Sequence, residues 1–252
     1  IEQAVGKLRE LLNGFDRTGF VVAEDEAQAK RFWEDRKRLG AIAAHTNAFK
    51  LNEDIVLPID SLAGFARFVD EYNVQEKKIN QIHIIDELTA ALDRAEPASD
   101  PELFEKRVRQ VKHVAFQIKQ KLDKASKDAI EASIHSKNFL TETLNRVQGY
   151  IDVVTLVNQA YDRAESRLIV IATHMHAGDG NVHVNIPVLS NDRTMMERAE
   201  IAADRVMEKA VELEGVVSGE HGIGVTKFKH LDRDRVVELA GYREKIDPNG
   251  LM

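Results

Sequence analysis

Apolar residues recur every three or four positions along much of the chain, a spacing that is typical of amphipathic helices. Residues 1–13 show it first, with Val5 and Leu8 on one face. A helix over residues 192–214 should end at Gly215, because glycine is common just after the last helical turn. The same spacing predicts further helices over residues 26–44, 61–72 and 226–240.

Short runs of β-branched residues indicate strands between these helices. Residues 168–173 read Leu-Ile-Val-Ile-Ala-Thr and predict a fully buried strand, whereas residues 182–186 alternate and predict a strand with one buried face. Residues 79–85 fit either a strand or the start of a helix. Shorter strands are predicted at 19–23, 55–58 and 216–218. Strands and helices therefore alternate, and the expected fold class is α+β, with helices covering one face of an antiparallel or mixed sheet.

The middle of the chain, roughly residues 85–165, has a different pattern. A helix should begin at Asp100-Pro101-Glu102, which supplies a cap, a first-turn proline and an acidic residue in the expected order. Apolar residues then alternate at spacings of four and three, which predicts a long antiparallel helical hairpin. This hairpin is either an insertion that packs on itself or a docking arm for another domain or subunit. Its two seams comprise Phe104, Val108, Val111, Ala115, Ile118, Leu122, Ala125 and Ala129, then Leu140, Leu144, Val147, Ile151 and Val154.

Composition narrows the classes of function. The 252 residues are 43% hydrophobic and 31% charged, enough to bury one sizeable core or two small ones. A net charge of -7 argues against a surface for nucleic acid or anionic membranes, because either favours a basic face. The absence of cysteine excludes disulfides, iron–sulfur ligation and thiol catalysis within these residues. Apolar runs such as 168–172 are far shorter than the roughly 20 residues that span a bilayer, so we expect a cytoplasmic protein without a transmembrane segment.

The densest group of chemically active side chains is His174-Met-His176-Ala-Gly-Asp-Gly-Asn-Val-His183-Val-Asn185. Apolar runs on both sides of the central Gly-Asp-Gly favour a strand–turn–strand hairpin. Such a hairpin brings His176 back beside His183, and neighbouring neutral imidazoles suit a divalent cation such as zinc or manganese. The alternative is that these are core histidines without a ligand.

A second group is Ser218-Gly-Glu220-His221-Gly-Ile-Gly224. Its glycines allow a tight turn, so Glu220 and His221 should project from a loop at a strand end. A carboxylate beside two histidines completes the composition of open catalytic metal sites. His221 then remains as a base near the metal, since histidine titrates near neutrality. The alternative is a glycine-rich turn with solvated polar tips, but together the two groups indicate a metal, a base and a water-poor pocket.

Residues 176–183 and 218–224 resemble the two hallmark motifs of the C-terminal domain of FAD-linked oxidases. This family includes D-lactate dehydrogenase, the glycolate oxidase flavoprotein subunit and D-2-hydroxyglutarate dehydrogenase. The ending Asp247-Pro-Asn-Gly-Leu-Met252 resembles the family's C-terminal signature. The resemblance is strong over 168–252 and looser over 15–75, where it rests on Phe32-Trp33-Glu-Asp-Arg36-Lys37 and Asp54-Ile-Val-Leu-Pro58. Residues 85–165 have no counterpart in the simpler members.

The roles that the resemblance implies for these two groups of residues agree with the roles that their chemistry indicates. It implies that His176, His183 and Glu220 bind a divalent metal. It further implies that His221 is the general base toward the hydroxyl group of the substrate. Oxidising a 2-hydroxy acid requires this proton to be removed while a hydride leaves Cα, and a metal on the hydroxyl assists by lowering its pKa.

The resemblance also implies residues that bind the substrate. Arg36 would hold the substrate carboxylate, where a guanidinium can pair with both oxygens, and Lys50 would assist it. Asn185 would contact the substrate as well. Two residues depart from the family pattern: Met175 stands where a glycine is usual, and His174 is an additional imidazole.

We therefore expect a ferredoxin-like α+β cap domain made of residues 1–84 and 166–252, with a helical-hairpin insertion at 85–165. None of the side chains above can accept a hydride, so the acceptor must be a flavin. FAD would lie mainly in a flavin domain of the same polypeptide that this chain lacks, since the chain begins at Ile1 and its last residues form a turn signal. The expected activity is that of an FAD-dependent 2-hydroxyacid dehydrogenase or oxidase, with the isolated piece inactive and colourless.

The expected ligand is a small 2-hydroxy acid such as D-lactate or glycolate. An iron–sulfur or other electron-acceptor partner could attach the protein peripherally to a membrane. Two alternatives remain open at this point. One is a metal-dependent hydrolase that uses the same two histidines and one glutamate, and the other is a non-catalytic module whose long helices recruit a partner. An upstream flavin domain would distinguish the first expectation from the hydrolase, and the intact motifs weigh against the non-catalytic module, in which Glu220 and His221 would have little to do.

Overall fold

The computed structural model describes residues 2–12, 21–39, 48–132 and 135–251. They belong to two compact units, Ile1–Asn47 and Ala48–Met252. The first unit contains helices α1 (Glu2–Leu12) and α2 (Glu26–Leu39), which confirms the predicted helices as far as they are described. Asp25 accepts a hydrogen bond from the backbone N–H of Gln28 at 2.7 Å, which explains why α2 begins there. Of the predicted strand at 19–23, residues 21–23 lie in no regular element, and the rest lies outside the described residues, as do residues 40–44.

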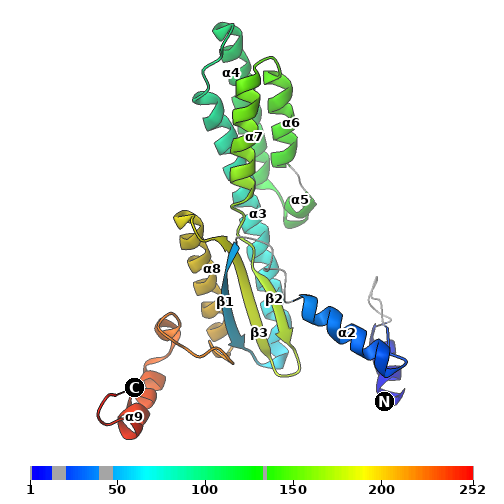
Figure 1. Ribbon diagram of the computed structural model, residues 1–252, viewed down its shortest axis with the longest axis vertical. Coiled ribbons are helices and arrows are strands. Elements are labelled where there is room, and N and C mark those ends of the chain that lie inside the picture. Colours follow the sequence, from blue (N-terminus) through cyan, green and yellow to red (C-terminus); the bar gives the residue numbers. More distant parts are fainter. Residues whose placement is uncertain (1, 13–20, 40–47, 133–134, 252) are drawn as a thin grey trace. The chain divides into compact units, whose positions relative to one another are not determined.

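A three-stranded sheet organises the second unit. Its order is β1 (Ala48–Val56), β3 (Asn181–Leu189) and β2 (Ala172–His176), and both pairings are antiparallel (Figure 1). The predicted α+β class and the alternating strand at 182–186 are confirmed. The predicted strand at 55–58 is the end of the longer β1.

The buried strand predicted at 168–173 is wrong in its position, because β2 begins only at Ala172. Ile169 and Ile171 are buried as expected, but they lie outside the strands. Asn73 accepts a hydrogen bond from the backbone N–H of Ile171 and donates one to its carbonyl oxygen, both at 2.8 Å. The side chain of Asn73, on a helix, thus satisfies the backbone N–H and carbonyl groups of Ile171 that would otherwise bond to a neighbouring strand.

Helices α3 (Leu62–Asp93) and α8 (Arg193–Glu212) cover one face of the sheet (Figure 1). Small side chains on α8 let it lie close to the strands, and Phe65 of α3 fills the space beside them. The apolar core on this face includes Val182, Val184, Ile186, Val188, Ala199, Ala202 and Val206. Because side chains alternate along a strand, the odd-numbered residues of β3 belong to the opposite face. We call that opposite face of the sheet the open face.

The middle of the chain is helical, as predicted, but it forms several helices rather than one two-helix hairpin. Helix α3 runs without interruption through the ambiguous residues 79–85. Four helices in the described part of the chain pack around the second half of α3 (Figure 1). They are α4 (Pro101–Lys124), α5 (Lys127–Ala132), α6 (His135–Val147) and α7 (Ile151–Glu165). The predicted start at Asp100 is confirmed, since its side chain accepts from the N–H of Leu103.

Two separate apolar cores result from this arrangement. The first lies under the sheet, and the second lies inside the helical bundle around Phe139, Val147 and Val157. Helix α3 contributes Phe65 to the first and Leu88 to the second. The uninterrupted helix therefore joins the two cores within one element. Whether residues 85–165 are an insertion in a simpler domain stays a prediction.

The C-terminal segment begins where α8 ends, with Glu212 as its last residue, close to the predicted end at Gly215. Val216 then forms a single antiparallel bridge with Val56 of β1 in place of the predicted strand. Short 3-10 turns occur at Ile59–Ser61 and Phe228–His230. The last helix, α9 (Arg233–Ile246), starts later than the predicted residue 226 because Asp232 caps it. Among the described residues, no helix combines the length and apolar character that crossing a membrane requires.

Candidate metal centre

The hairpin of β2 and β3 brings the histidines of the first motif together. His176 is paired with Asn181, and His174 with His183, so these four residues share the open face. Residues 177–180 form the turn, in which Asp179 donates its backbone N–H to the carbonyl of His176 at 2.9 Å. The strand–turn–strand hairpin predicted from the sequence is therefore confirmed.

Gly180 is the position in this turn that only glycine can fill. Its φ is +73°, in the left-handed region that other residues rarely adopt. A Cβ atom there would lie 2.0 Å from the carbonyl oxygen of Leu57. The backbone of Leu57 also donates a hydrogen bond to the carbonyl of Gly180 at 2.9 Å, which ties the turn to the segment after β1.

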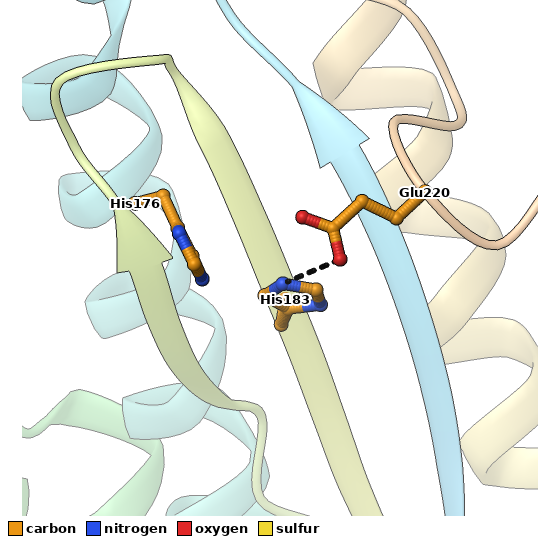
Figure 2. A group of neighbouring side chains, drawn as sticks. All are labelled: His176, His183 and Glu220. Carbon is orange, nitrogen blue, oxygen red and sulfur yellow. Dashed lines mark ion pairs between the residues drawn. The ribbon is translucent and has the colours of Figure 1, made fainter. Parts of the chain in front are cut away.

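Glu220 reaches the hairpin from a loop that follows α8. Figure 2 shows its carboxylate directed at His183, with the ring of His176 nearby on the neighbouring strand. Glu220 Oε2 lies 3.7 Å from His183 Nε2. One possible ligand atom from each of the three residues lies within 4.8 Å of the other two. The structure thus brings these side chains together, and their binding of a metal stays a prediction.

The donor set has the chemistry that a divalent cation requires. Two imidazoles and one carboxylate around zinc at about 2.0–2.2 Å place neighbouring donors roughly 3.4 Å apart in a tetrahedral site. The ligand atoms here lie up to 4.8 Å apart, so binding a metal requires side-chain rotations that bring them up to about 1.4 Å closer. His183 is buried while His176 and Glu220 are exposed, so one side of the group is open to a further ligand.

His183 lies at the centre of a cluster of imidazoles. Its ring stacks on that of His174 with centroids 4.7 Å apart, and the ring of His176 meets it edge-on at 5.6 Å. The ring of His221 lies 5.4 Å from it. The side chain of His221 is 34% exposed, so a small molecule bound beside His183 can reach it.

Asp54 anchors the loop that carries Glu220 and His221, a role that the sequence analysis did not assign to it. It is fully buried, and its Oδ2 accepts backbone N–H groups from Gly219 at 2.7 Å, from Glu220, and from His221 at 3.1 Å. Its Oδ1 accepts a hydrogen bond of 2.6 Å from the buried Lys227. Burial alone would raise the pKa of Asp54, but the hydrogen bonds from Lys227 and from the three N–H groups hold that pKa far below its usual range.

Asn181 is a second residue that the motif reading did not assign. Its Nδ2 donates a hydrogen bond to Glu220 Oε1 at 2.6 Å, which leaves Oε2 directed at His183. Asp54 offered a weak sequence signal, because it stands directly before the apolar residues Ile55 to Leu57. Lys227 gave no comparable signal, since it lies in a segment with several other basic residues.

The three predicted substrate-binding residues have different outcomes. Asn185 lies on the open face, and its Nδ2 is 3.3 Å from His174 Nδ1. Lys50 lies in β1 opposite Pro187, but its side chain lies outside the described part of the structure. Arg36 belongs to α2 in the other unit, and its side chain also lies outside the described part. Their roles stay predictions.

Comparison with known proteins identifies the family. A family model described as "FAD linked oxidases, C-terminal domain" matches residues 1–86 and 105–252. The unmatched residues include the connection between α3 and α4. Because the match continues through most of the helical bundle, it does not mark residues 85–165 as an insertion.

Individual relatives match over shorter stretches. The chain is 31% identical over 105 residues to the glycolate oxidase subunit GlcD of Bacillus subtilis, covering 40% of this chain and 22% of the relative. It is 26% identical over 101 residues to the mitochondrial D-lactate dehydrogenase [cytochrome] of Arabidopsis thaliana, covering 38% and 18%. It is 28% identical over 123 residues to the D-2-hydroxyglutarate dehydrogenase of Stutzerimonas stutzeri, covering 46% and 25%. The matches thus span about a fifth of the length of these relatives, and the chain belongs to the FAD-linked oxidase family through its C-terminal domain.

Proposed function

We propose that this chain is the substrate-side part of an FAD-dependent oxidoreductase that oxidises a small 2-hydroxy acid such as D-lactate or glycolate. One observation carries the proposal: possible ligand atoms of His176, His183 and Glu220 lie within 4.8 Å of one another, and His221 lies beside His183. The names of the relatives support the substrate class, because glycolate, D-lactate and D-2-hydroxyglutarate all carry a hydroxyl group next to a carboxylate.

In this proposal His176, His183 and Glu220 hold a divalent metal, either zinc or manganese. FAD is bound mainly by a flavin domain of the same polypeptide. When bound, the metal supplies a positive charge that makes the substrate hydroxyl more acidic, and the flavin supplies the hydride acceptor. Asn181 orients the Glu220 carboxylate, since its amide occupies one of the two oxygens and leaves the other facing His183.

His221 acts as the base that takes the proton from the substrate hydroxyl. An imidazole is suited to this step because histidine is the side chain that most often acts as a general base. Asp54 Oδ1 lies 3.6 Å from His221 Nδ1, so its negative charge stabilises the imidazolium that forms. The opposite ring nitrogen, Nε2, is then the atom that accepts the proton.

The substrate carboxylate requires its own contacts. We assign it to Arg36 and Lys50, with the amide of Asn185 as a neutral contact on the open face. We keep the division into a cap domain of residues 1–84 and 166–252 with residues 85–165 as a helical addition. The apolar cores support its second part alone, since the core under the sheet contains no described residue between 85 and 165. An iron–sulfur or other electron-acceptor protein would reoxidise the flavin.

Anaerobic reduction of the flavin tests this function. The polypeptide is prepared together with its flavin domain and mixed with glycolate, D-lactate, L-lactate and a primary alcohol that lacks the carboxylate. We expect at least one 2-hydroxy acid to bleach the oxidised flavin, and we expect chelation to abolish the reaction until zinc or manganese is restored. Metal-dependent ester or amide hydrolysis without flavin reduction would instead favour the hydrolase.

A further inference from the structure

Asp54 and Lys227 form a buried charged pair beside the candidate metal centre. Asp54 is fully buried and Lys227 is 3% exposed. Lys227 Nζ lies 2.6 Å from Asp54 Oδ1, 3.1 Å from the backbone oxygen of Asp54, and 3.1 Å from Glu53 Oε2. Removing two charges from water is costly, and buried pairs of this kind are frequently no more stabilising than apolar residues of the same volume. Stability alone therefore does not explain the pair.

The contacts of Asp54 with the loop indicate a different purpose. A single carboxylate oxygen collects three successive backbone N–H groups, those of Gly219, Glu220 and His221. The hydroxyl of Ser218 lies 3.4 Å from the other oxygen. Because the segment is rich in glycine, its backbone has many accessible conformations when it is unrestrained. The carboxylate selects one of them.

The sheet register places this anchor next to the centre of the site. Asp54 pairs with His183 across β1 and β3, so both side chains lie on the open face at the same position along the strands. The loop approaches these strands closely at Gly219, where a Cβ atom would lie 2.9 Å from Asn181 Oδ1 and 2.8 Å from Val56 Cγ2. The loop therefore has little freedom to shift while the carboxylate holds it.

We propose that Asp54 and Lys227 are positioning residues for the metal ligand and the base. Asp54 fixes the backbone of the loop so that the Glu220 carboxylate and the His221 imidazole both reach His183. Lys227 neutralises the buried carboxylate and holds its orientation, with Glu53 as a second contact. The inference rests on the proposed function only in taking Glu220 as a ligand and His221 as the base.

Two variants separate positioning from simple stabilisation. Asp54→Asn keeps the size of the side chain but weakens its hold on the N–H groups and on Lys227. The double variant Asp54→Asn/Lys227→Met also removes the buried cation. We expect Co²⁺ affinity, followed by visible absorption, to fall by about 10- to 100-fold in both, the range seen when partners of metal ligands are removed. The double variant should unfold at a higher temperature than the single variant, because no poorly paired charge remains buried.

Amide hydrogen exchange provides a readout that needs no metal. Exchange at Gly219, Glu220 and His221 should accelerate in both variants, because the acceptor for these three N–H groups is weakened. Asp192→Asn is the matched control. Asp192 also accepts a backbone N–H, that of Met195, and pairs with Arg167 at 2.6 Å, but it follows the opposite end of β3 from the metal centre. This control should change neither the Co²⁺ affinity nor the exchange in the loop.

The outcomes distinguish this inference from the proposed function. If Co²⁺ affinity recovers together with the unfolding temperature in the double variant, the pair is only structural and the inference is overturned. The same holds if parent protein and variants bind Co²⁺ equally and exchange at equal rates. If the parent protein binds no Co²⁺, the proposed metal site fails, and amide hydrogen exchange alone tests the role of Asp54. Faster exchange of the loop amides in the variants then supports the anchoring of the loop by Asp54, and unchanged exchange overturns it.

Discussion

Replacing His221 with alanine is expected to lower the rate of flavin reduction by a factor of roughly 100 to 10,000, the contribution typical of a positioned base. The metal affinity should change little, because Glu220, His176 and His183 remain in place. The fold should also persist, since the His221 side chain is partly exposed and lies on a loop outside both apolar cores. Single-turnover reduction by the preferred 2-hydroxy acid measures the rate, and a titration with Co²⁺ measures the metal affinity.

A matched control separates the role of His221 from a general effect of removing a histidine. His113→Ala serves as the control, because His113 is an exposed histidine on α4 that contacts Gln117. Full turnover in His221→Ala would remove His221 from the mechanism.

Replacing Glu220 with alanine is expected to weaken metal binding by more than roughly 100-fold. An effect of about 100-fold is the upper end for losing a side chain that contacts a ligand but not the metal itself. The substitution removes the carboxylate from the donor set and leaves two imidazoles. It also leaves Asn181 Nδ2 without its 2.6 Å acceptor. Glu220→Gln should have a smaller effect, because its amide oxygen can still coordinate but carries no charge. Competition for Zn²⁺ with a chromophoric chelator measures the affinity.

Glu212→Ala provides the matched control for Glu220. Glu212 is an exposed carboxylate at the end of α8 that pairs with Lys209 at 2.8 Å. Its removal changes the net charge by the same amount as Glu220→Ala without touching the donor set. Equal affinities for Zn²⁺ in the parent protein, Glu220→Ala and Glu212→Ala would show that Glu220 is not a ligand. Thermal unfolding of each variant establishes that the fold is retained.

The elements that could be predicted from the sequence are those specified by their own residues. The alternation of Val182, Val184 and Ile186 defined β3, and the side chain of Asp100 defined the start of α4. The hairpin at 174–185 was predictable for the same reason, because its turn glycines and flanking apolar runs are local. The grouping of Glu220 with the histidines followed from chemistry rather than from geometry.

The features that escaped prediction depend on partners distant in sequence. The start of β2 is displaced because Asn73 binds the backbone of Ile171, 98 residues away. Lys227 is 173 residues from the Asp54 carboxylate that it neutralises. The continuous α3 was missed because residues 79–85 are apolar and β-branched, and their environment is set by helices that follow later in the chain. No local pattern encodes any of these pairings.

In the proposed site, His176, His183 and Glu220 hold one metal ion beside a histidine, His221, that does not bind it. Anomalous diffraction from crystals of the metal-loaded protein, recorded at the zinc edge, tests it most directly. We expect one peak bound by the two imidazoles and the carboxylate at about 2.0–2.2 Å, with His221 nearby but outside the coordination sphere. Zinc coordinated by His221 or His174 in place of Glu220, or zinc found only at other acidic side chains, would contradict it.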